Sequence, residues 1–267
     1  MSVYVKEQPA FLKTSIQSML DQTVAPDQIV LVKDGPLTEE LDAVIDGFKQ
    51  EHADLFTIVV SEENIGLGRA LALGMGYCKN EIVARMDTDD IAKKDRMEKQ
   101  LACFDQDENL SIVGSNISEF IDNEDNIVSR RVVPSTHADI CEYLKKRCPF
   151  NHMTVTFKKS EVEKAGGYQH WFYNEDSFLW VRMYLAECKF LNLEEDLVNV
   201  RINQETFKRR GGYKYYKSER DLFKYMKDHK IITGWQYFKA KCIRFVVQVL
   251  MPNKVRAWFF KKFARNK

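Results

Sequence analysis

Short apolar runs alternate with segments of helical periodicity through the first 90 residues of this 267-residue chain. The runs are rich in β-branched residues and cover 29–32, 56–60 and 82–86, whereas helical spacing marks 12–20, 37–48 and 66–77. This alternation predicts βαβ units and a mostly parallel sheet. Runs that do not alternate apolar with polar residues are typical of strands covered on both faces, so we predict an α/β fold.

The second half of the chain has a mixed pattern. Helices are predicted at 96–104, 137–146 and 175–188, and strands at 112–120, 154–157, 190–193 and 197–202. No linker rich in Pro, Gly or Ser and no internal repeat separates these elements. We therefore expect one domain over residues 1–210, with two halves that meet near residue 90, and a helical tail over 211–267.

The formal net charge of +1 hides an uneven distribution. Residues 231–267 contain nine Lys and Arg and no Asp or Glu, so the preceding residues carry 31 basic and 39 acidic side chains. A nearly neutral chain does not indicate a nucleic-acid partner. A basic tail on an acidic body instead predicts contact with anionic lipid or another acidic surface.

Aromatic and aliphatic residues of the tail are interleaved with Lys and Arg between Trp235 and Phe260, and Pro252 divides this stretch. The pattern fits a helix that lies on an anionic membrane. It fits equally well a helix that packs on the rest of the chain or on a second subunit. The most apolar stretch, 242–251, is too short to cross a bilayer and contains Arg244 and Gln248.

The N-terminus has no secretory signal pattern. The six cysteines form no C-x-x-C pair, which favours free thiols over a disulfide framework or a zinc site. We therefore expect a cytoplasmic protein, with the tail as a candidate for peripheral attachment to the inner face of the plasma membrane.

Three carboxylates, Asp87, Asp89 and Asp90, directly follow the predicted strand at 82–86. Ligands in open α/β sheets bind beyond the carboxyl ends of the strands. Neighbouring carboxylates repel one another unless a cation lies among them, and Mg²⁺ and Mn²⁺ prefer oxygen ligands. We predict that Asp87 and Asp89 bind a divalent cation; a solvated acidic turn is the alternative.

Two further segments are candidates for binding a nucleotide. Asp34 ends the strand at 29–32, where its carboxylate can accept hydrogen bonds from a base or ribose and the following Gly35 permits a tight turn. Residues 63–69, which include Asn64, two glycines and Arg69, open a helix whose N-terminus favours an anion. An ordinary turn or helix packing explains each segment equally well when it is taken alone.

Glu175 and Asp176 open the predicted helix at 175–188, where acidic residues also occur for helix stability alone. Their functional interpretation is a general base that removes a proton from a hydroxyl group. Aromatic residues just before them are candidates for a sugar or lipid platform, although core packing is the default for any one of them. These residues are Tyr168, Trp171, Phe172 and Tyr173.

Two more polar features complete the candidate set. His152 precedes the strand at 154–157 and is a candidate metal ligand or acceptor contact, with a structural role favoured over either. Arg209 and Arg210 precede a Gly-Gly pair in a basic loop. Such a loop is suited to close over a diphosphate, and a solvated loop is the alternative.

In this order, the segments together resemble family 2 glycosyltransferases with the GT-A fold, especially bacterial enzymes of polysaccharide assembly. The resemblance covers the chain from Ser2 to about Gly211. It rests on pieces that are unspecific singly but specific as an ordered set: residues 2–7, 18–23, 32–35, 64–67, 87–90, and Glu175-Asp176 with Trp180 and Arg182. Two departures are a first strand shorter than usual and Val5 where the family often has Asn.

The resemblance implies a nucleotide-binding half over residues 1–90 and an acceptor half over 91–210. The donor contacts that it implies are Tyr4, Glu7, Asp34, Arg69 and Asp87. The patterns described above add Asn64 and, from the later basic loop, Arg209 and Arg210.

The resemblance also implies the chemistry. Asp89 holds Mn²⁺ or Mg²⁺, with Asp87 lying toward the ribose and the metal, and Asp176 is the base, with Glu175 beside it. A single inverting displacement then moves a sugar from a nucleoside diphosphate, UDP by resemblance, to a hydroxyl group. The implied acceptor is a saccharide or a lipid-linked saccharide in surface polysaccharide biosynthesis.

Two other functions remain open. A sugar nucleotidylyltransferase also combines an α/β fold with nucleotide and metal, but residues 6–11 lack the glycine that its triphosphate loop needs. A degenerate transferase that acts as a non-catalytic, membrane-associated assembly partner is favoured slightly by the short first strand and Val5. The intact Asp87, Asp89 and Asp176 argue against it.

Overall fold

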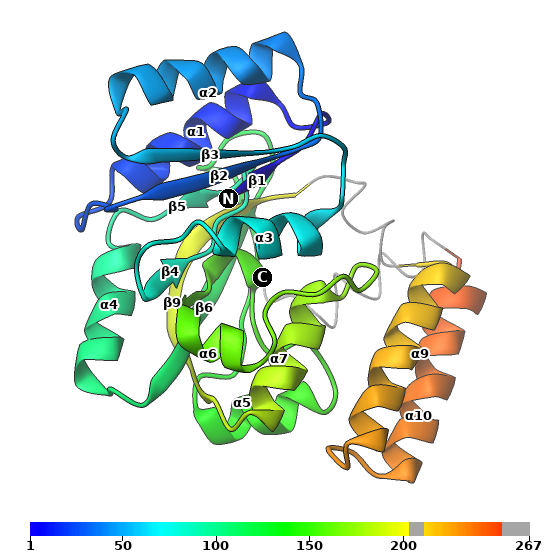
Figure 1. The fold of residues 1–267 in the computed structure, drawn as a ribbon. Coiled ribbons are helices and arrows are strands. Elements are labelled where there is room, and N and C mark those ends of the chain that lie inside the picture. The colour runs from blue at the N-terminus through cyan, green and yellow to red at the C-terminus, as the bar shows by residue number, and fades with distance from the viewer. Residues whose placement is uncertain (203–210, 253–267) are drawn as a thin grey trace.

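The computed structural model describes residues 1–202 and 211–252. Its N-terminal part is a three-stranded parallel sheet in the order β1-β2-β3. The strands are β1 (Ser2–Val3), β2 (Ile29–Asp34) and β3 (Phe56–Ser61). Helices α1 (Pro9–Leu20) and α2 (Glu39–Glu51) cover one face and α3 (Leu67–Met75) covers the other (Figure 1).

The alternation of side chains along β2 explains why both faces are covered. Ile29 and Leu31 belong to a core cluster with α1 and α2. Val30 and Val32 face the opposite way and pack with residues of α3. A strand without a polar face therefore requires helices on both sides, as the sequence pattern predicted.

A second, six-stranded sheet follows, in the order β4-β8-β6-β9-β5 with β7 paired to β6. Its strands are β4 (Ile82–Ala84), β5 (Ile91–Ala92), β6 (Leu110–Phe120), β7 (Ile127–Arg131), β8 (Thr156–Lys158) and β9 (Lys189–Arg201). Strands β6 and β9 run parallel, whereas the other pairs in this sheet are antiparallel. Every residue of β6 is buried, so this strand forms the centre of the second half.

Helices of the second half pack on this sheet (Figure 1). They are α4 (Arg96–Gln106), α5 (His137–Leu144), α6 (Lys159–Lys164) and α7 (Glu175–Leu185), with a 3₁₀ turn, η1 (His152–Thr154). Trp180 of α7 is fully buried, and its ring centroid lies 5.2 Å from that of Phe150. This aromatic contact lies in the largest core cluster and fixes α7 against the sheet.

The tail contains two helices, α9 (Tyr213–Asp228) and α10 (Gly234–Phe245), which run side by side (Figure 1). A π-helical turn, η2 (Val246–Leu250), continues α10. Leu222, Phe223 and Met226 of α9 belong to the same core cluster as Trp180. Within residues 1–202 and 211–252, no helix has the length and apolarity needed to cross a membrane.

The predicted α/β fold is confirmed, and the strands and helices expected in the first 90 residues are all present. Two strands expected at 190–193 and 197–202 form instead one strand, β9. The acidic residues between them lie at an irregularity in the pairing of β9 with β6, after which the strand continues. Glu195 forms an ion pair with Lys99, and Asp196 forms one with Arg130. The short elements β5, β7 and α6 were not predicted. All six cysteines are free, as expected.

Candidate active site

The segment between β4 and β5 is an irregular turn that carries the three carboxylates. One carboxylate oxygen from each of Asp87, Asp89 and Asp90 lies within 4.8 Å of the others. The two residues predicted to bind a cation therefore lie together, and Asp90 adds a third carboxylate. We call these three residues the carboxylate turn.

Arg85 lies beneath the carboxylate turn. Its guanidinium donates to both carboxylate oxygens of Asp87, and only 4% of Arg85 is exposed. Although burial opposes the charged form, the Asp87 carboxylate raises the pKa of Arg85 above its usual value. Arg96 of α4 is fully buried and donates to the Arg85 carbonyl oxygen at 2.8 Å, so α4 holds the end of β4 in place.

The electrostatics of the carboxylate turn favour a cation. Burial and the charges of Asp87 and Glu7 raise the pKa of Asp89 to about 7. Burial and the charges of Asp89 and Asp87 raise the pKa of Asp90 well above its usual value. A divalent ion would relieve both the burial penalty and the repulsion, and an all-carboxylate donor set fits Mg²⁺ or Mn²⁺.

The end of β9 supports the same turn. The backbone N–H of Arg201 donates to the Asp90 carboxylate at 2.9 Å, and its Nε donates to the Asp89 carbonyl oxygen at 3.3 Å. The guanidinium lies 3.8 Å from the ring centroid of Phe11 and 4.6 Å from that of Phe120. Arg201 therefore joins the second sheet to the carboxylate turn and to α1.

Asp34 organises the next loop of the site. Its carboxylate accepts hydrogen bonds from the backbone N–H of Ile65 at 2.7 Å and of Gly66 at 3.2 Å. The Asn64 amide in turn donates to the Asp34 carbonyl oxygen at 3.2 Å. Gly35 has a φ of +87°, and a Cβ there would lie 2.8 Å from the Asn64 nitrogen. The two candidate nucleotide segments are thus in direct contact, and only glycine fits between them.

Glu7 connects the loop after β1 to the carboxylate turn. One of its carboxylate oxygens accepts a hydrogen bond from the Thr88 hydroxyl, with 2.7 Å between the two oxygens. Tyr4, in the same loop, is exposed, and so is Arg69 in the first turn of α3. The structure therefore brings Glu7 to the predicted metal ligands and leaves the side chains of Tyr4 and Arg69 facing solvent.

The N-terminal turns of α3 and α7 touch. A Cβ at Gly68 would lie 3.0 Å from the Gln169 carbonyl oxygen and 3.0 Å from the Cβ of Glu175. Burial, followed by the charge of Asp176, raises the pKa of Glu175 to about 7, and Asp87 adds to this rise while Arg85 opposes it. Glu175 is therefore electrostatically coupled to the carboxylate turn.

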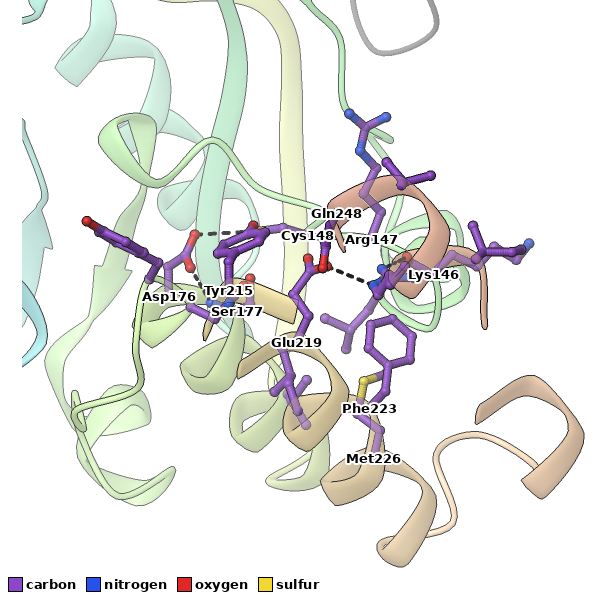
Figure 2. Close-up of a pocket in the computed structure, with 18 of the residues that line it drawn as sticks. Lys146, Arg147, Cys148, Asp176, Ser177, Tyr215, Glu219, Phe223, Met226 and Gln248 are labelled. Atoms are coloured by element: carbon purple, nitrogen blue, oxygen red, sulfur yellow. Dashed lines mark hydrogen bonds and ion pairs between the residues drawn. The ribbon is translucent and has the colours of Figure 1, made fainter. Parts of the chain in front are cut away.

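Asp176 lines a cavity of about 470 Å³, which we call the Asp176 cavity (Figure 2). Its carboxylate accepts the backbone N–H of Ser177 at 2.6 Å, and the sulfur of Cys148 lies 3.5 Å from its second oxygen. The walls come from the start of α7, from Leu144 and residues 146–148, from α9, from the end of α10 and from η2. The tail helices thus complete a cavity that begins at the predicted base.

Among the described residues, the group of possible metal ligands consists of the three carboxylates and does not include His152. Its Nε2 is 2.9 Å from the Tyr168 hydroxyl, and its ring packs edge-on against Trp180. Burial lowers the pKa of His152 well below its usual value, so the ring is neutral. This environment matches the structural histidine that the sequence favoured over a metal ligand.

The aromatic residues before α7 have separate environments. Tyr168 is buried beside His152, and the Trp171 indole donates to the Ser218 carbonyl oxygen at 3.1 Å. Phe172 lies under the Lys214 ammonium, whereas Tyr173 lines the Asp176 cavity. Only Tyr173 of this group is therefore in a position to meet a ligand in that cavity. Arg209 and Arg210 lie outside the described residues.

Several site residues had no predicted role. Arg85 stands two positions before Asp87, and the two-residue period of a strand was the available signal that their side chains share a face. Cys148, Arg147 and Gln248 had no such signal, because they reach the Asp176 cavity from segments distant in the sequence.

The chain is similar to known glycosyltransferases. A family model described as glycosyl transferase family 2 matches residues 1–163. The UDP-Gal:alpha-D-GlcNAc-diphosphoundecaprenol beta-1,3-galactosyltransferase of Escherichia coli is 36% identical, over all of this chain and 95% of its own length. The amylovoran biosynthesis glycosyltransferase AmsE of Erwinia amylovora is 37% identical, over 98% of this chain and 97% of its own.

Solved structures share the fold. The mannosyltransferase PcManGT from Pyrobaculum calidifontis, in complex with GDP-Man and Mn²⁺, has a TM-score of 0.64 and 15% identity over all of this chain and 75% of its own. TarS from S. aureus has a TM-score of 0.65 and 14% identity over 92% of this chain, which spans 42% of TarS. The GT-A fold is therefore confirmed, and, with the family model covering more than half of its residues, the chain belongs to glycosyl transferase family 2.

Proposed function

We propose that this protein transfers a sugar, with inversion, from a UDP-sugar to a lipid-linked saccharide in bacterial surface polysaccharide synthesis. The observation that carries the proposal is the adjacency of two sets of carboxylates. The carboxylate turn is suited to a metal and a diphosphate. Glu175 lies within electrostatic range of Asp87 in that turn, and the neighbouring Asp176 lines the Asp176 cavity. The relative that acts on UDP-Gal and a GlcNAc-diphosphoundecaprenol supports the choice of donor and acceptor.

The donor is bound by the first half of the chain, residues 1–90. Asp34 fixes the 64–66 loop, where the nucleoside lies, and the exposed Tyr4 is available to cover it. Arg69 faces solvent at the start of α3, where a cation and a helix N-terminus both attract phosphate. Glu7 fixes Thr88 and so orients the backbone of the carboxylate turn.

The acceptor is bound by the second half, residues 91–210, together with the tail helices. Asp176 accepts the proton of the acceptor hydroxyl while that oxygen forms a bond to the anomeric carbon of the sugar. The bond from this carbon to the diphosphate oxygen breaks, and its electron pair leaves with the nucleoside diphosphate. Asp89 and Asp87 would hold a divalent ion, which would supply neutralising charge for the departing diphosphate.

Glu175 is the second candidate base, because burial and the charge of Asp176 raise its pKa to about 7, within the range suited to a general base. Only Asp176 lines the cavity, so we assign it the proton transfer. We expect Asp176→Asn to lower kcat for transfer by about 10²–10⁴-fold. A smaller loss in Asp176→Asn than in Glu175→Gln would reverse the assignment.

The test of the function is nucleotide release and product analysis. UDP-Gal and other UDP-sugars are incubated with Mn²⁺ or EDTA and with N-acetylglucosamine linked through a diphosphate to a short lipid. We expect one preferred sugar, metal-dependent release of UDP, and a product with the opposite anomeric configuration by NMR. Absence of transfer from every nucleotide sugar would leave the degenerate, non-catalytic partner as the better account.

The outer face of α10 supports attachment of the enzyme to the membrane that carries such an acceptor. Trp235 and Phe238 are 72% and 53% exposed, and their rings stack with centroids 5.8 Å apart. Lys239 and Lys241 are exposed on the same helix, whereas Ala240 is buried against the body. Aromatic side chains beside lysines suit the interface of an anionic membrane.

We expect the Trp235→Ser/Phe238→Ser variant to lose co-sedimentation with vesicles that contain anionic lipid. The matched control is Val60→Ser/Tyr77→Ser, which removes two exposed apolar side chains, 63% and 51% exposed, from the other part of the molecule. Equal sedimentation of the two variants would exclude α10 as the membrane contact.

A further inference from the structure

The Asp176 cavity has two ends of different character (Figure 2). Asp176, Ser177 and Tyr215 lie at one end, and Lys146 and Arg147 lie at the other. The end at Asp176 offers a carboxylate, a hydroxyl and an aromatic ring, which are groups that contact a sugar. The distant end is basic.

The cations of the cavity differ in how far they are already neutralised. Arg244 forms an ion pair with Glu219 at 3.0 Å and lies 4.0 Å from the centroid of the Phe223 ring. Arg131 donates to the Cys148 carbonyl oxygen at 2.9 Å. Arg147 is half-buried on the rim, and within residues 1–202 and 211–252 no carboxylate lies within ion-pair distance of its guanidinium. Arg147 is therefore a lining residue of the Asp176 cavity whose charge no described carboxylate neutralises by an ion pair.

The remaining wall is apolar and comes from the tail. Leu222 and Met226 of α9 and Val247 of η2 line the cavity. The neighbouring Val246 and Leu250 of η2 are exposed on the outside of the same turn. An apolar chain that leaves the cavity past η2 therefore emerges at the C-terminal end of α10, the helix whose first turns carry the exposed Trp235 and Phe238.

We propose that the Asp176 cavity binds the diphosphate and the first lipid units of the acceptor, with Arg147 as the side chain that holds the diphosphate. This inference rests on the proposed function, since it takes the acceptor to be a saccharide joined to a lipid by a diphosphate. The sugar lies at Asp176, the diphosphate lies at the basic rim, and the lipid lies against α9 and η2. Arginine suits the rim, because its planar fork binds phosphate oxygens in pairs.

The first test measures binding without any donor. N-acetylglucosamine joined through a diphosphate to a short lipid is titrated into wild type, Arg147→Gln and Lys145→Gln. Lys145 is a matched control, because it is a neighbouring cation that pairs with Glu142 and does not line the cavity. We expect Arg147→Gln to weaken binding about 10-fold or more and Lys145→Gln to leave it unchanged. Equal affinities for all three proteins would overturn the proposal.

The second test uses transfer and separates this site from the proposed function. With the diphosphate-linked acceptor, Arg147→Gln raises KM for the acceptor by the same factor as it weakens binding. With an alkyl glycoside of the same sugar, which has no diphosphate, wild type and Arg147→Gln have the same KM. Transfer by wild type with no effect of Arg147→Gln on either acceptor contradicts the site but not the function. Arg147-dependent binding without transfer contradicts the function but not the site.

Discussion

The guanidinium of Arg85 holds both carboxylate oxygens of Asp87 from a buried position beneath the carboxylate turn. Removing one partner of such a pair leaves an uncompensated charge, here beside Asp89 and Asp90. We expect Arg85→Gln to lower the free energy of unfolding by about 3 kcal/mol, measured by urea denaturation at pH 8.

The control for this prediction is a pair of the same chemistry on the surface. Arg130 also donates two hydrogen bonds to one carboxylate, that of Asp196, but its side chain is 46% exposed. Arg130→Gln should cost about 0–1 kcal/mol. If the unfolding free energy falls by the same amount in both variants, burial does not increase the contribution of the Arg85–Asp87 pair to stability.

Asp89→Asn should separate stability from function. Without a metal, the Asp89 carboxylate is costly because burial, Asp87 and Glu7 all oppose its charge. We expect Asp89→Asn to raise the unfolding free energy of the metal-free protein by about 1–3 kcal/mol at pH 8. Mn²⁺ should raise the Tm of wild type but not that of Asp89→Asn. The rate of UDP release should be about 100-fold or more lower in this variant than in wild type. A metal response equal to that of wild type would refute the assignment of Asp89.

Gly68→Ala should disturb the contact between α3 and α7. The new Cβ would lie 3.0 Å from Glu175 Cβ and from the Gln169 carbonyl oxygen, so α7 has to shift and carry Glu175-Asp176 with it. We expect kcat to fall about 10-fold or more, because catalytic groups tolerate displacements well below 1 Å.

Gly47→Ala is the matched control for Gly68→Ala. Gly47 lies within α2, and a Cβ there would meet no atom within 4 Å. Alanine at this position should stabilise the protein by about 0.5–1 kcal/mol and leave kcat unchanged. Similar kcat values for the two variants would show that the close approach at Gly68 has no role in catalysis.

Glu175 gives the stability of the protein a defined pH dependence. Burial and the charge of Asp176 raise its pKa in the folded state to about 7 from the ordinary value of 4.5, so the folded state binds the proton more tightly. Its contribution to stability is complete below pH 4.5 and is lost as the pH rises through 7. The gain in stability from Glu175→Gln should therefore grow between pH 4.5 and 7, reaching on the order of 1–3 kcal/mol above pH 7.

The control for the pH prediction is Glu40, whose pKa is lowered by hydrogen bonds to its own backbone and to Thr38. A lowered pKa stabilises the folded state above the unfolded pKa, so Glu40→Gln should be slightly less stable than wild type at pH 7. Parallel pH profiles for Glu175→Gln and wild type would contradict the burial of Glu175.

The N-terminal unit was predictable because its pattern is local. The apolar run at 29–32 and the flanking helical periods identify β2 and its two covering layers without any distant information. The strand β9 was less predictable, because charges at 194–196 resemble a loop until Lys99 and Arg130 are seen opposite them. The edge strand β7 has apolar residues only at its first two positions, Ile127 and Val128, which is too short a run to identify a strand.

The two parts of the site differ in the same way. Asp87, Asp89 and Asp90 are neighbours in sequence, and their position after a strand was sufficient to predict a common location. The Asp176 cavity combines the start of α7 with Arg147, α9 and η2. A pattern within one segment contains no information about which other segments fold against it, so this cavity required the three-dimensional structure.

The parallel pairing of β6 with β9 determines when the second sheet can finish folding. During synthesis the sheet of β1, β2 and β3 is available once residue 61 has been made, because all of its strands precede that point. Strand β6, whose eleven residues are all buried in the finished fold, has to wait for β9, which ends at Arg201. Pairing of strands that are so distant in the sequence is slow, and the apolar side chains of β6 are exposed to solvent until it occurs. The nascent chain should therefore be most prone to aggregation, and most dependent on chaperones, while residues 121–201 are being made.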